Sequence, residues 1–369
     1  MTAPSVTSHR QTLNFSAGPA VLPECVLEQA ARDIIDLDNT GIGVLEHSHR
    51  GPSIDRIFEE AVSDCRELGQ IPDDFEILFL QGGASGQFGM IPMNFLGEGR
   101  GADYVDTGSW TTKAVKDAAT IGTARVAWSG AESQYRSIPH AADIMWSGEA
   151  AYGYYCTNNT IYGTQWSEVP QCPAPLIADM SSDIFSRPID WSRLSMVFAG
   201  AQKNIGPAGA TLVIVRKDLL EQARSDLPAM FRYDVHAKKG SRYNTPPVFA
   251  VYCAGLVFKW ILDLGGLDAV ALMNQRKAAL VYQAIDESDG FYSGHADSDA
   301  RSLMNIPFTT PTPELDAAFI SEAASHGMTT LKGHRSVGGI RASIYNAFPE
   351  EGCSRLAEFM REFAAANRG

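Results

Sequence analysis

The chain has 369 residues, of which 45% are hydrophobic and 20% charged, and its formal net charge at pH 7 is −13. A chain of this size can bury a sizeable core, in about two domains. The acidic balance argues against nucleic acid or an anionic membrane surface as the main partner. No apolar run approaches the ~18 residues of a membrane span, so we expect no membrane-spanning segment.

The N-terminal sequence MTAPSVTSHRQTLNF lacks the apolar region of a signal peptide and is typical of an arm. The six cysteines are scattered, with no CxxC pair and no zinc-ligand spacing. These features predict a cytoplasmic protein with reduced thiols and no metal site.

The predicted elements, taken in chain order, are typical of an α/β domain with a largely parallel sheet. A strand over 75–80 is followed by a glycine-rich turn and a helix over 87–95. Helical stretches such as TTKAVKDAATIG separate the later elements. The further predicted strands are 102–108, 151–157, 175–182, 195–201 and 211–217.

From Val248 a long apolar-periodic segment, VFAVYCAGLVFKWILDLGG, predicts a buried helix that links two domains. Beyond it, short strand patterns alternate with helical ones, as in a smaller α+β domain. We therefore expect an N-terminal arm over residues 1–25, a large α/β domain over 26–265 and a small α+β domain over 266–369.

Lys203 interrupts an apolar run in VFAGAQKNIGPAGATLVIV, which resumes after NIGPAG. The ordinary interpretation is a solvated turn lysine, and the alternative is an amine held where it can form a Schiff base. Asp179, in IADMSSD, lies inside an apolar strand and needs either a structural cation or a cationic ring nitrogen as partner. If their strands are parallel neighbours, both residues face one crevice at the carboxyl edge of the sheet.

Two further motifs are compatible with a ligand but weak on their own. QGGASGQF at 81–88 is a glycine-rich turn before a helix, where backbone N–H groups can bind an anion. A tight turn without a ligand fits the same pattern. Trp110, in DTGSW, can stack on a flat ligand or simply belong to the core.

Arginines follow histidines at two places, His49–Arg50 in EHSHRG and His334–Arg335 in KGHRSVGG. Arg341 lies in the strand-like run GGIRASIYN. Guanidinium groups offer forked donors to phosphate and carboxylate, so the pattern suggests a dianionic ligand. Ordinary surface ion pairs are the alternative.

Taken together and in order, these strings resemble a known family. NFSAGPA, EHSHRG, QGGASGQF, GSW, CTNNTIYG, ADMSSD, AGAQKNIGPAG, NTPP and GHRSVGGIRASIYNA are similar to motifs of the phosphoserine aminotransferases, class-V enzymes that use pyridoxal 5'-phosphate (PLP). The resemblance implies the PLP-dependent transferase fold of type I. One departure is GGASGQF, where many members read GGGRGQF or similar. The backbone N–H groups of this turn can still bind a phosphate, but the side chain at position 85 is a serine instead of an arginine.

The resemblance also implies roles for individual residues. Lys203 resembles the lysine that holds PLP covalently, Asp179 the acid that pairs with the pyridine nitrogen, and Trp110 the ring stacked on the cofactor. The other implied cofactor-binding residues are Ala84, Ser85, Thr160 and Gln202, with Asn244 and Thr245 reaching in from the second subunit of a homodimer. The implied substrate-binding residues are Arg341 for the α-carboxylate and His49, Arg50, His334 and Arg335 for the phosphate, partly across the dimer interface.

The implied reaction is ping-pong transamination between L-glutamate or 2-oxoglutarate and 3-phosphohydroxypyruvate or O-phospho-L-serine, in serine biosynthesis. The sequence does not rank phosphoserine against 4-phosphohydroxy-L-threonine of the vitamin B6 route, which carries the same recognised groups. Other class-V reactions remain alternatives, namely alanine–glyoxylate transamination and cysteine desulfuration, although no cysteine lies in a desulfurase-like motif. A non-catalytic PLP- or phosphate-binding protein is a further alternative. A dinucleotide-binding dehydrogenase is disfavoured because no GxGxxG follows the first strand.

Overall fold

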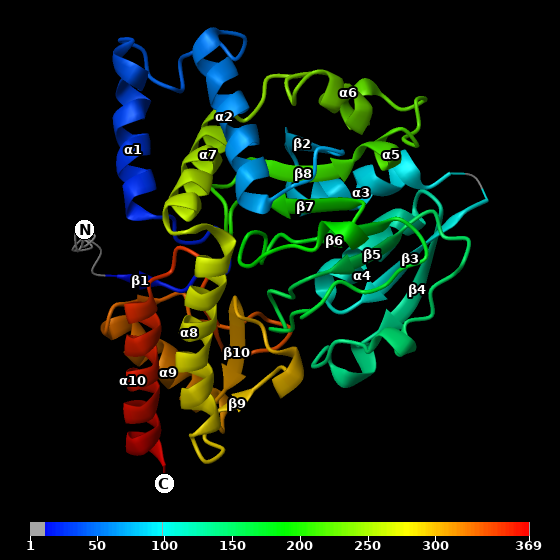
Figure 1. Cartoon of the computed structure of the whole chain (residues 1–369). Coiled ribbons are helices and arrows are strands. Elements are labelled where there is room, and N and C mark those ends of the chain that lie inside the picture. Colours follow the sequence, from blue (N-terminus) through cyan, green and yellow to red (C-terminus); the bar gives the residue numbers. More distant parts are fainter. Residues whose placement is uncertain (1–11, 98, 369) are drawn as a thin grey trace.

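The computed structural model describes residues 12–97 and 99–368. A large sheet with helices on both faces lies beside a smaller group of strands and helices (Figure 1). The helices are α1 (Glu24–Ile35), α2 (Pro52–Gly69), α3 (Gly83–Phe95), α4 (Ser109–Ala119), α5 (Lys217–Leu220), α6 (Tyr233–Lys238), α7 (Val248–Asp263), α8 (Gly266–Asp286), α9 (Pro313–Ser325) and α10 (Glu350–Asn367).

The large sheet has seven strands in the order β2-β8-β7-β6-β5-β3-β4. Strand β8 runs antiparallel to β2 and β7, and the other neighbouring pairs are parallel. Its strands are β2 (Phe75–Leu80), β3 (Gly101–Asp106), β4 (Thr123–Ser129), β5 (Gly153–Cys156), β6 (Leu176–Asp179), β7 (Met196–Gly200) and β8 (Thr211–Arg216). The α/β class and the mostly parallel sheet are as predicted.

Side-chain alternation along the strands places the large sheet between two cores. Ile77 and Phe79 of β2 pack with helices α2 and α7 on one face. Leu78 and Leu80, from the same strand, pack with α3 and α4 on the other face. Strand β4 was not predicted, because it lies at the edge of the sheet and only one of its residues, Ala127, is buried.

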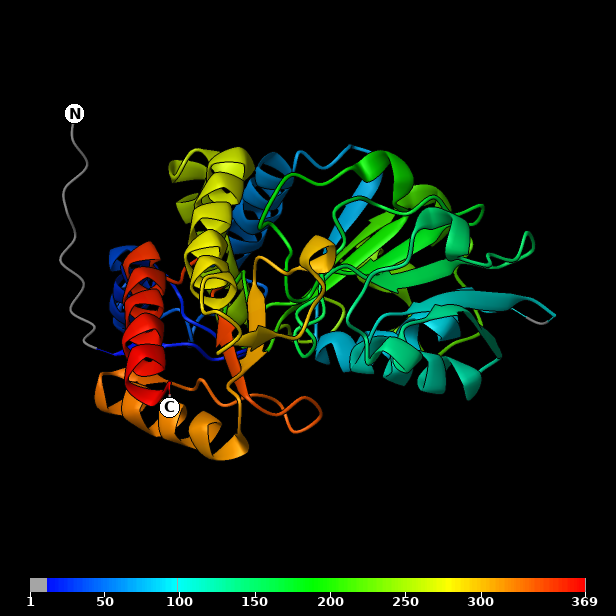
Figure 2. The same cartoon turned by 90° about the horizontal axis from the view of Figure 1, so that it is seen from below.

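The smaller part is built on a three-stranded antiparallel sheet in the order β12-β10-β9. Helices α8 and α10 pack on each other there, and the N-terminal strand lies beside α10 in both views (Figures 1 and 2). The strands are β9 (Ser293–Gly294), β10 (Asn305–Thr309) and β12 (Ile340–Ser343), with a separate parallel pair of β1 (Leu13–Asn14) and β11 (Met328–Thr329).

The buried helix predicted from Val248 is α7, and a second helix follows it directly. Helix α7 ends at Asp263 and α8 begins at Gly266, and their axes differ by 84°. Gly265 and Gly266 have φ of +101° and +77° at this bend, a backbone region that glycine adopts readily. Residues up to Val270 belong to the core under α7, and those from Ala278 belong to a separate core with Phe15. The change from one core to the other therefore falls within α8, after Val270 and before Ala278, and the boundary near residue 265 stays a prediction.

The N-terminal arm is described only from residue 12 onward, and residues 1–11 of the predicted arm lie outside the described residues. Residues 13–15 pair with β11 and pack in the core of the smaller part. Among the described helices, none alone is long and apolar enough to span a bilayer. The bent α7–α8 pair, taken together, has the length and apolar composition of a membrane span.

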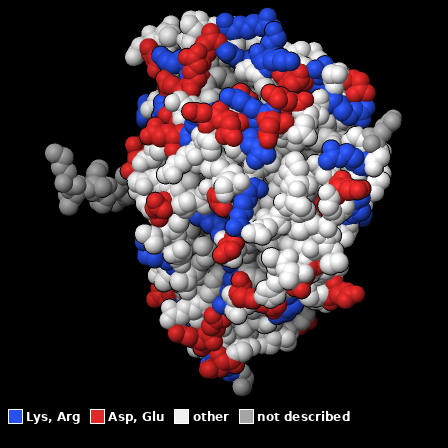
Figure 3. Space-filling model, turned by 45° about the vertical axis from the view of Figure 1, so that its right-hand side comes forward, with Lys and Arg blue, Asp and Glu red and all other residues white. Residues whose placement is uncertain are grey.

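Charges on the face in Figure 3 are mixed, with Lys and Arg interspersed among Asp and Glu and uncharged areas between them. The net charge of −13 is therefore not gathered into one acidic patch on this face.

Candidate active site

Three neighbouring strands deliver polar side chains to one crevice at the carboxyl edge of the large sheet. Asp179 is the last residue of β6, and Lys203 lies in the turn after β7, its parallel neighbour. Nζ of Lys203 donates a 2.7 Å hydrogen bond to Oγ1 of Thr160, in the loop after β5. The predicted parallel pairing of the strands at Asp179 and Lys203 is confirmed.

Burial opposes charge on both of these groups. Asp179 is 3% exposed, and its Oδ1 accepts a 2.9 Å hydrogen bond from the Ser181 N–H. Desolvation raises the pKa of Asp179, against the lowering effects of Ser181 and Lys203. Desolvation also lowers the pKa of Lys203, and Asp179 is the largest opposing influence. A cation placed directly against Asp179 would therefore be stabilised, since a buried carboxylate needs a partner.

An aromatic face lies beside the amine. Trp110 is near the N-terminus of α4, and its ring centroid is 5.9 Å from Nζ of Lys203. Lys113, one helical turn later, holds its Nζ 4.3 Å from the same centroid. Sequence reasoning missed Lys113, although its i+3 spacing from Trp110 places the two on one helix face.

The glycine-rich turn opens directly into α3, which begins at Gly83 rather than near residue 87 as predicted. Gly82 and Gly83 have φ of +96° and +62°, which lets the chain turn sharply from β2 into the helix. Ala84 and Ser85 stand in the first helical turn, where backbone N–H groups have no intrahelical acceptor and favour an anion. This geometry needs no side chain from Ser85.

Asn244 lies beside this turn. Its Nδ2 donates to Oε1 of Gln81 at 2.8 Å and to the carbonyl of Thr245 at 3.0 Å. The NTPP segment thus borders the glycine-rich turn within one chain. Its predicted reach into a second subunit stays a prediction.

The N-terminal NFSAGPA segment covers the Lys203 turn. The N–H of Ala20 donates to the carbonyl of Gln202 at 2.9 Å. Gly18 has φ of +131°, and a Cβ there would lie 3.2 Å from Cγ of Lys203. Glycine at this position lets the segment approach the lysine closely, which sequence reasoning had not assigned.

Arg341 reaches the crevice from the smaller part of the molecule. It lies on β12, is half-buried, and donates from Nη1 to the carbonyl of Thr160 at 3.3 Å. Burial lowers its pKa. The two parts therefore meet at Thr160, whose hydroxyl binds Lys203 and whose carbonyl binds Arg341.

His334 and Arg335 lie on the loop that enters β12. Burial lowers the pKa of His334, and the charges of Arg341, Arg335 and Lys113 lower it further. A nearby dianion would act in the opposite direction. The loop therefore lies in a cationic environment, with Arg341 and Lys113 nearby.

His49 and Arg50 lie elsewhere in this single chain. They precede α2, where His49 lines a cavity of about 500 Å³ together with residues 207–209 and Thr245–Ala250. Among the hydrogen bonds and ion pairs between described residues, none joins His49 or Arg50 to His334 or Arg335. The structure does not bring the two His–Arg pairs together within one chain.

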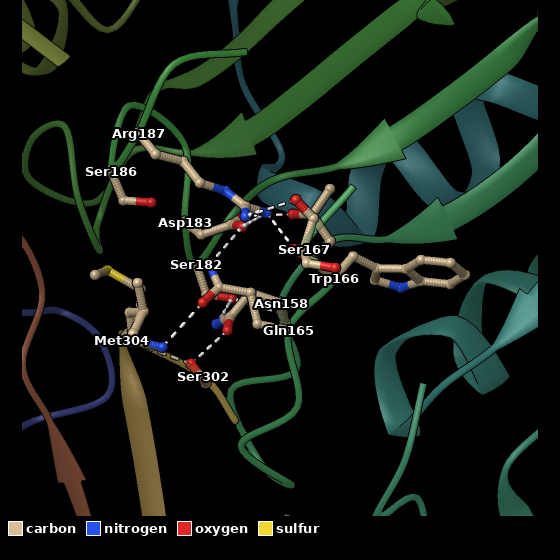
Figure 4. Close-up of polar contacts among 12 residues, drawn as sticks. Asn158, Gln165, Trp166, Ser167, Ser182, Asp183, Ser186, Arg187, Ser302 and Met304 are labelled. Carbon is tan, nitrogen blue, oxygen red and sulfur yellow. Dashed lines mark hydrogen bonds and ion pairs between the residues drawn. The ribbon is translucent and has the colours of Figure 1, made fainter. Parts of the chain in front are cut away.

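A second buried carboxylate, Asp183, lies next to the residues that form the crevice. The sequence analysis did not identify it. It accepts hydrogen bonds from the Thr157 hydroxyl and from Nε2 of Gln165, the latter at 3.0 Å, and Arg187 lies 3.9 Å away (Figure 4). Burial raises its pKa, while Arg187, Thr157 and Gln165 oppose this shift. The Thr157 hydroxyl is also 3.1 Å from the Asp179 carbonyl oxygen, so this network orders the end of β6.

Asn158 ties the large part to the smaller one beneath the crevice (Figure 4). Its carbonyl accepts from Oγ of Ser182 at 2.7 Å, and its side chain contacts Ser302 and Asn305 near β10. The relative position of the two parts at Thr160 is thereby supported by buried hydrogen bonds.

The donor set fits the expected cofactor. The buried carboxylate of Asp179, which forms no salt bridge among the described residues, suits a protonated ring nitrogen, and the first turn of α3 suits a phosphate. The Trp110 ring suits a flat aromatic, and the amine of Lys203 suits an aldehyde carbon. Among the described residues, no group of three or more His, Cys, Asp or Glu is arranged to hold a metal ion.

Comparison with known proteins gives one consistent result. The family model described as "Aminotransferase class-V" matches residues 12–356. A phosphoserine aminotransferase of Desulfotalea psychrophila is 53% identical, covering 96% of this chain and 98% of its own. Another from Geobacillus kaustophilus is 51% identical, with the same coverage.

Solved structures agree. Phosphoserine aminotransferase from Bacillus circulans subsp. alkalophilus superposes with a TM-score of 0.95 and 48% identity, covering 98% of this chain and all of its own. A PLP-bound phosphoserine aminotransferase from Trichomonas vaginalis gives a TM-score of 0.88 and 41% identity, covering 95% of this chain and 99% of its own. An alanine–glyoxylate aminotransferase from Nostoc sp., at 15% identity and TM-score 0.73, shares the fold and covers 98% of this chain and 97% of its own.

Proposed function

The chain belongs to the class-V aminotransferase family, and from this premise we propose that it is a phosphoserine aminotransferase. It exchanges an amino group between L-glutamate and 3-phosphohydroxypyruvate, giving 2-oxoglutarate and O-phospho-L-serine. Relatives at about half identity over nearly the whole chain carry this name. The structural observation that carries the proposal is the meeting of Lys203, Thr160 and Arg341 under the His334–Arg335 loop.

Pyridoxal 5'-phosphate is the cofactor, and when bound it accepts the electron pair left on the substrate as the Cα proton departs. Lys203 would anchor the cofactor through its amine and, as a free amine, would take the substrate Cα proton as base and deliver it as acid to the C4′ atom of the cofactor. Asp179 keeps the ring nitrogen protonated by charge pairing. Trp110 covers one face and excludes water, and Thr160 orients the amine of Lys203.

The cofactor phosphate is held by the first turn of α3, through Ala84 and Ser85, with Gln202 beside it. Asn244 and Thr245 complete this set from the second subunit. Because Ser85 brings no positive charge, the backbone N–H groups supply the recognition on that side of the cradle.

Two groups of cationic side chains recognise the two ends of the substrate. Arg341 binds the α-carboxylate, which both substrates present. His334 and Arg335 bind the phosphate of phosphoserine or the second carboxylate of glutamate. His49 and Arg50 join them across a dimer interface, which accounts for their separation within one chain.

We propose a homodimer with shared sites. The surface around His49 exposes apolar side chains that a partner would cover: Ile34, Ile35, Ile42 and Leu45. Mixed dimers test this directly. Lys203→Ala and Arg50→Ala are each expected to be inactive, and their co-expression to restore activity at one site per dimer. No restored activity would contradict sharing.

Glutamate formation tests the reaction itself. PLP-loaded enzyme is given 2-oxoglutarate with phosphoserine, 4-phosphohydroxy-L-threonine, serine or cysteine, and in a separate arm alanine with glyoxylate. We expect the phosphorylated donors to be used and serine not. Turnover of alanine with glyoxylate, or sulfide release from cysteine, without phosphoserine turnover would overturn the proposal in favour of another class-V reaction. The 4-phosphohydroxy-L-threonine arm tests whether the enzyme also serves the vitamin B6 route. We further propose that the enzyme works in the cytoplasm.

A further inference from the structure

Lys277 is a buried lysine that the reaction described above does not use. It lies on α8, its residue is 0% exposed, and its ammonium faces backbone carbonyls rather than water. Nζ donates to the carbonyls of Ile344, Tyr345, Asn346 and Phe348 at 3.1, 2.7, 3.4 and 3.2 Å. Within residues 12–97 and 99–368, no carboxylate lies within ion-pair distance of it.

Burying an ammonium group without a carboxylate partner carries a large desolvation penalty. We therefore ask which part of the structure its hydrogen bonds hold in place. The four acceptors lie within residues 344–348, the segment that follows β12 and therefore follows Arg341. A single cation on a helix of the smaller part thus gathers the carbonyls of one irregular segment.

The 344–348 segment is connected to the Lys203 turn through Asn346. The backbone N–H of Asn346 donates to Oδ1 of Asn204 at 3.0 Å, and Asn204 is the residue after Lys203. The Asn346 side chain is itself held on both sides, by the carbonyl of Phe185 and by Nδ2 of Asn274, each at 2.9 Å.

A second connection runs through Tyr345. Its hydroxyl donates to the carbonyl of Ala17 at 2.9 Å, beside Gly18. Burial raises the pKa of this hydroxyl, and the nearby Thr160 side chain opposes that shift. Thr160 is the acceptor for Nζ of Lys203. Both the backbone and the amine of Lys203 are therefore linked to the carbonyls that Lys277 holds.

We propose that Lys277 is a positioning residue for transamination: by holding the 344–348 segment, it sets the place of the Lys203 amine through Asn346–Asn204 and Tyr345–Thr160. This inference rests on the proposed function but concerns residues outside the site. It adds a structural support that neither the sequence motifs nor the cofactor chemistry identify.

Electrostatics gives this support a pH dependence. Burial lowers the pKa of Lys277 to about 8, and the titratable groups that face it are Cys353 and Glu350 of α10. Glu350 also pairs with the exposed Arg276 at 3.1 Å. Above about pH 8 the amine has one donor fewer for the carbonyls, and the hold on the segment weakens.

The test compares Lys277→Met with Arg276→Met, which removes the neighbouring exposed cation from the same helix. With PLP-loaded protein we expect Lys277→Met to lower kcat about ten- to a hundredfold, as for a misplaced reacting group, with KM for glutamate nearly unchanged. The visible absorption of the Lys203-bound cofactor should change its pH midpoint by about half a unit or more. Arg276→Met should resemble the wild type in both measurements.

A purely structural role predicts a lower melting temperature with an unchanged kcat and an unchanged absorption midpoint, and that result would overturn the proposal. If Lys277→Met fails to fold, the same comparison is made with Lys277→Gln, which keeps two N–H donors without the charge. Failure of the proposed function is distinguishable, since the wild type and Arg276→Met would then both lack phosphoserine turnover while the absorption comparison still reports on Lys277.

Discussion

The amine of Lys203 and the hydroxyl of Thr160 form a 2.7 Å hydrogen bond across two neighbouring strand ends. The carbonyl of the same threonine accepts from Arg341, at 3.3 Å. One residue therefore contacts both the amine that we propose anchors the cofactor and the guanidinium that we propose binds the substrate carboxylate. These two hydrogen bonds hold the amine and the guanidinium in a defined relative position, as preorganised catalysis requires.

Removing the amine tests its double role. Lys203→Ala is expected to abolish the visible absorption of the lysine-bound cofactor and to lower transamination by more than the ~10²–10⁴-fold that one proton-transfer group contributes. Lys217→Ala, at an exposed lysine near Glu76, is the control and should keep full activity. A Lys203→Ala protein that retains the absorption band would contradict the assignment.

Asp179→Asn should have opposite effects with and without cofactor. In the cofactor-free protein burial raises the pKa of Asp179 above its ordinary value of 3.8. The folded state therefore binds more protons than the unfolded state at every pH between 3.8 and this raised pKa. Stability from this group therefore falls as pH rises through that window. Asparagine removes the buried charge and keeps an acceptor for Ser181, so cofactor-free Asp179→Asn should be more stable than the wild type at pH 7.

In the loaded protein the same substitution removes the partner of the ring nitrogen. Cofactor affinity should fall by about 1.5–3 kcal/mol, the usual size of a hydrogen bond to a charged group. Thermal unfolding with and without PLP measures both effects. Equal destabilisation in both states would contradict the cofactor role of Asp179.

Arg335→Ala should affect phosphorylated substrates more than glutamate. Loss of a charge-assisted contact costs about 1.5–3 kcal/mol, so kcat/KM for phosphoserine should fall about 10- to 100-fold, with a smaller loss for glutamate. Arg341→Ala should lower both, since both present an α-carboxylate. Steady-state kinetics with each substrate decides, and equal losses for Arg335→Ala would contradict its role.

The loop that carries His334 and Arg335 depends on glycine at a close approach. Gly339 has φ of +61°, and a Cβ there would lie 2.5 Å from the Phe308 carbonyl oxygen. Gly339→Ala should therefore destabilise the protein by about 1–3 kcal/mol and raise KM for phosphoserine. Gly338 has φ of +79° but open space around it, so Gly338→Ala should cost only about 1 kcal/mol. Matched melting curves and KM values check the pair.

Sequence reasoning located Asp179 and Lys203 because each ends or follows an apolar run, and the runs proved to be β6 and β7. It missed β4, whose residues are mostly exposed at the sheet edge. Lys113 and Lys277 were missed for a different reason. A lysine in a helical pattern is ordinarily expected to face solvent. The i+3 spacing on one helix could have indicated that Lys113 lies over Trp110, whereas only tertiary packing shows that Lys277 is buried.

The placement of His49 and Arg50 also could not be derived from spacing. Both His–Arg pairs have the same local pattern, yet one lies by Arg341 and the other beside the cavity before α2. Which surfaces face each other across a dimer is a property of assembly, which a single chain's pattern does not encode. Asp183 likewise became visible only through its hydrogen bonds to Thr157 and Gln165.

The most direct test of the account is a half-reaction. PLP-loaded enzyme is mixed with phosphoserine, or with plain serine, without any keto acid, and the visible absorption of the Lys203-bound cofactor is followed. We expect the band to disappear with phosphoserine and to persist with serine, because only phosphoserine carries the dianion that we propose the His–Arg residues bind. A band that ignores phosphoserine, or disappears equally with serine, would contradict the account.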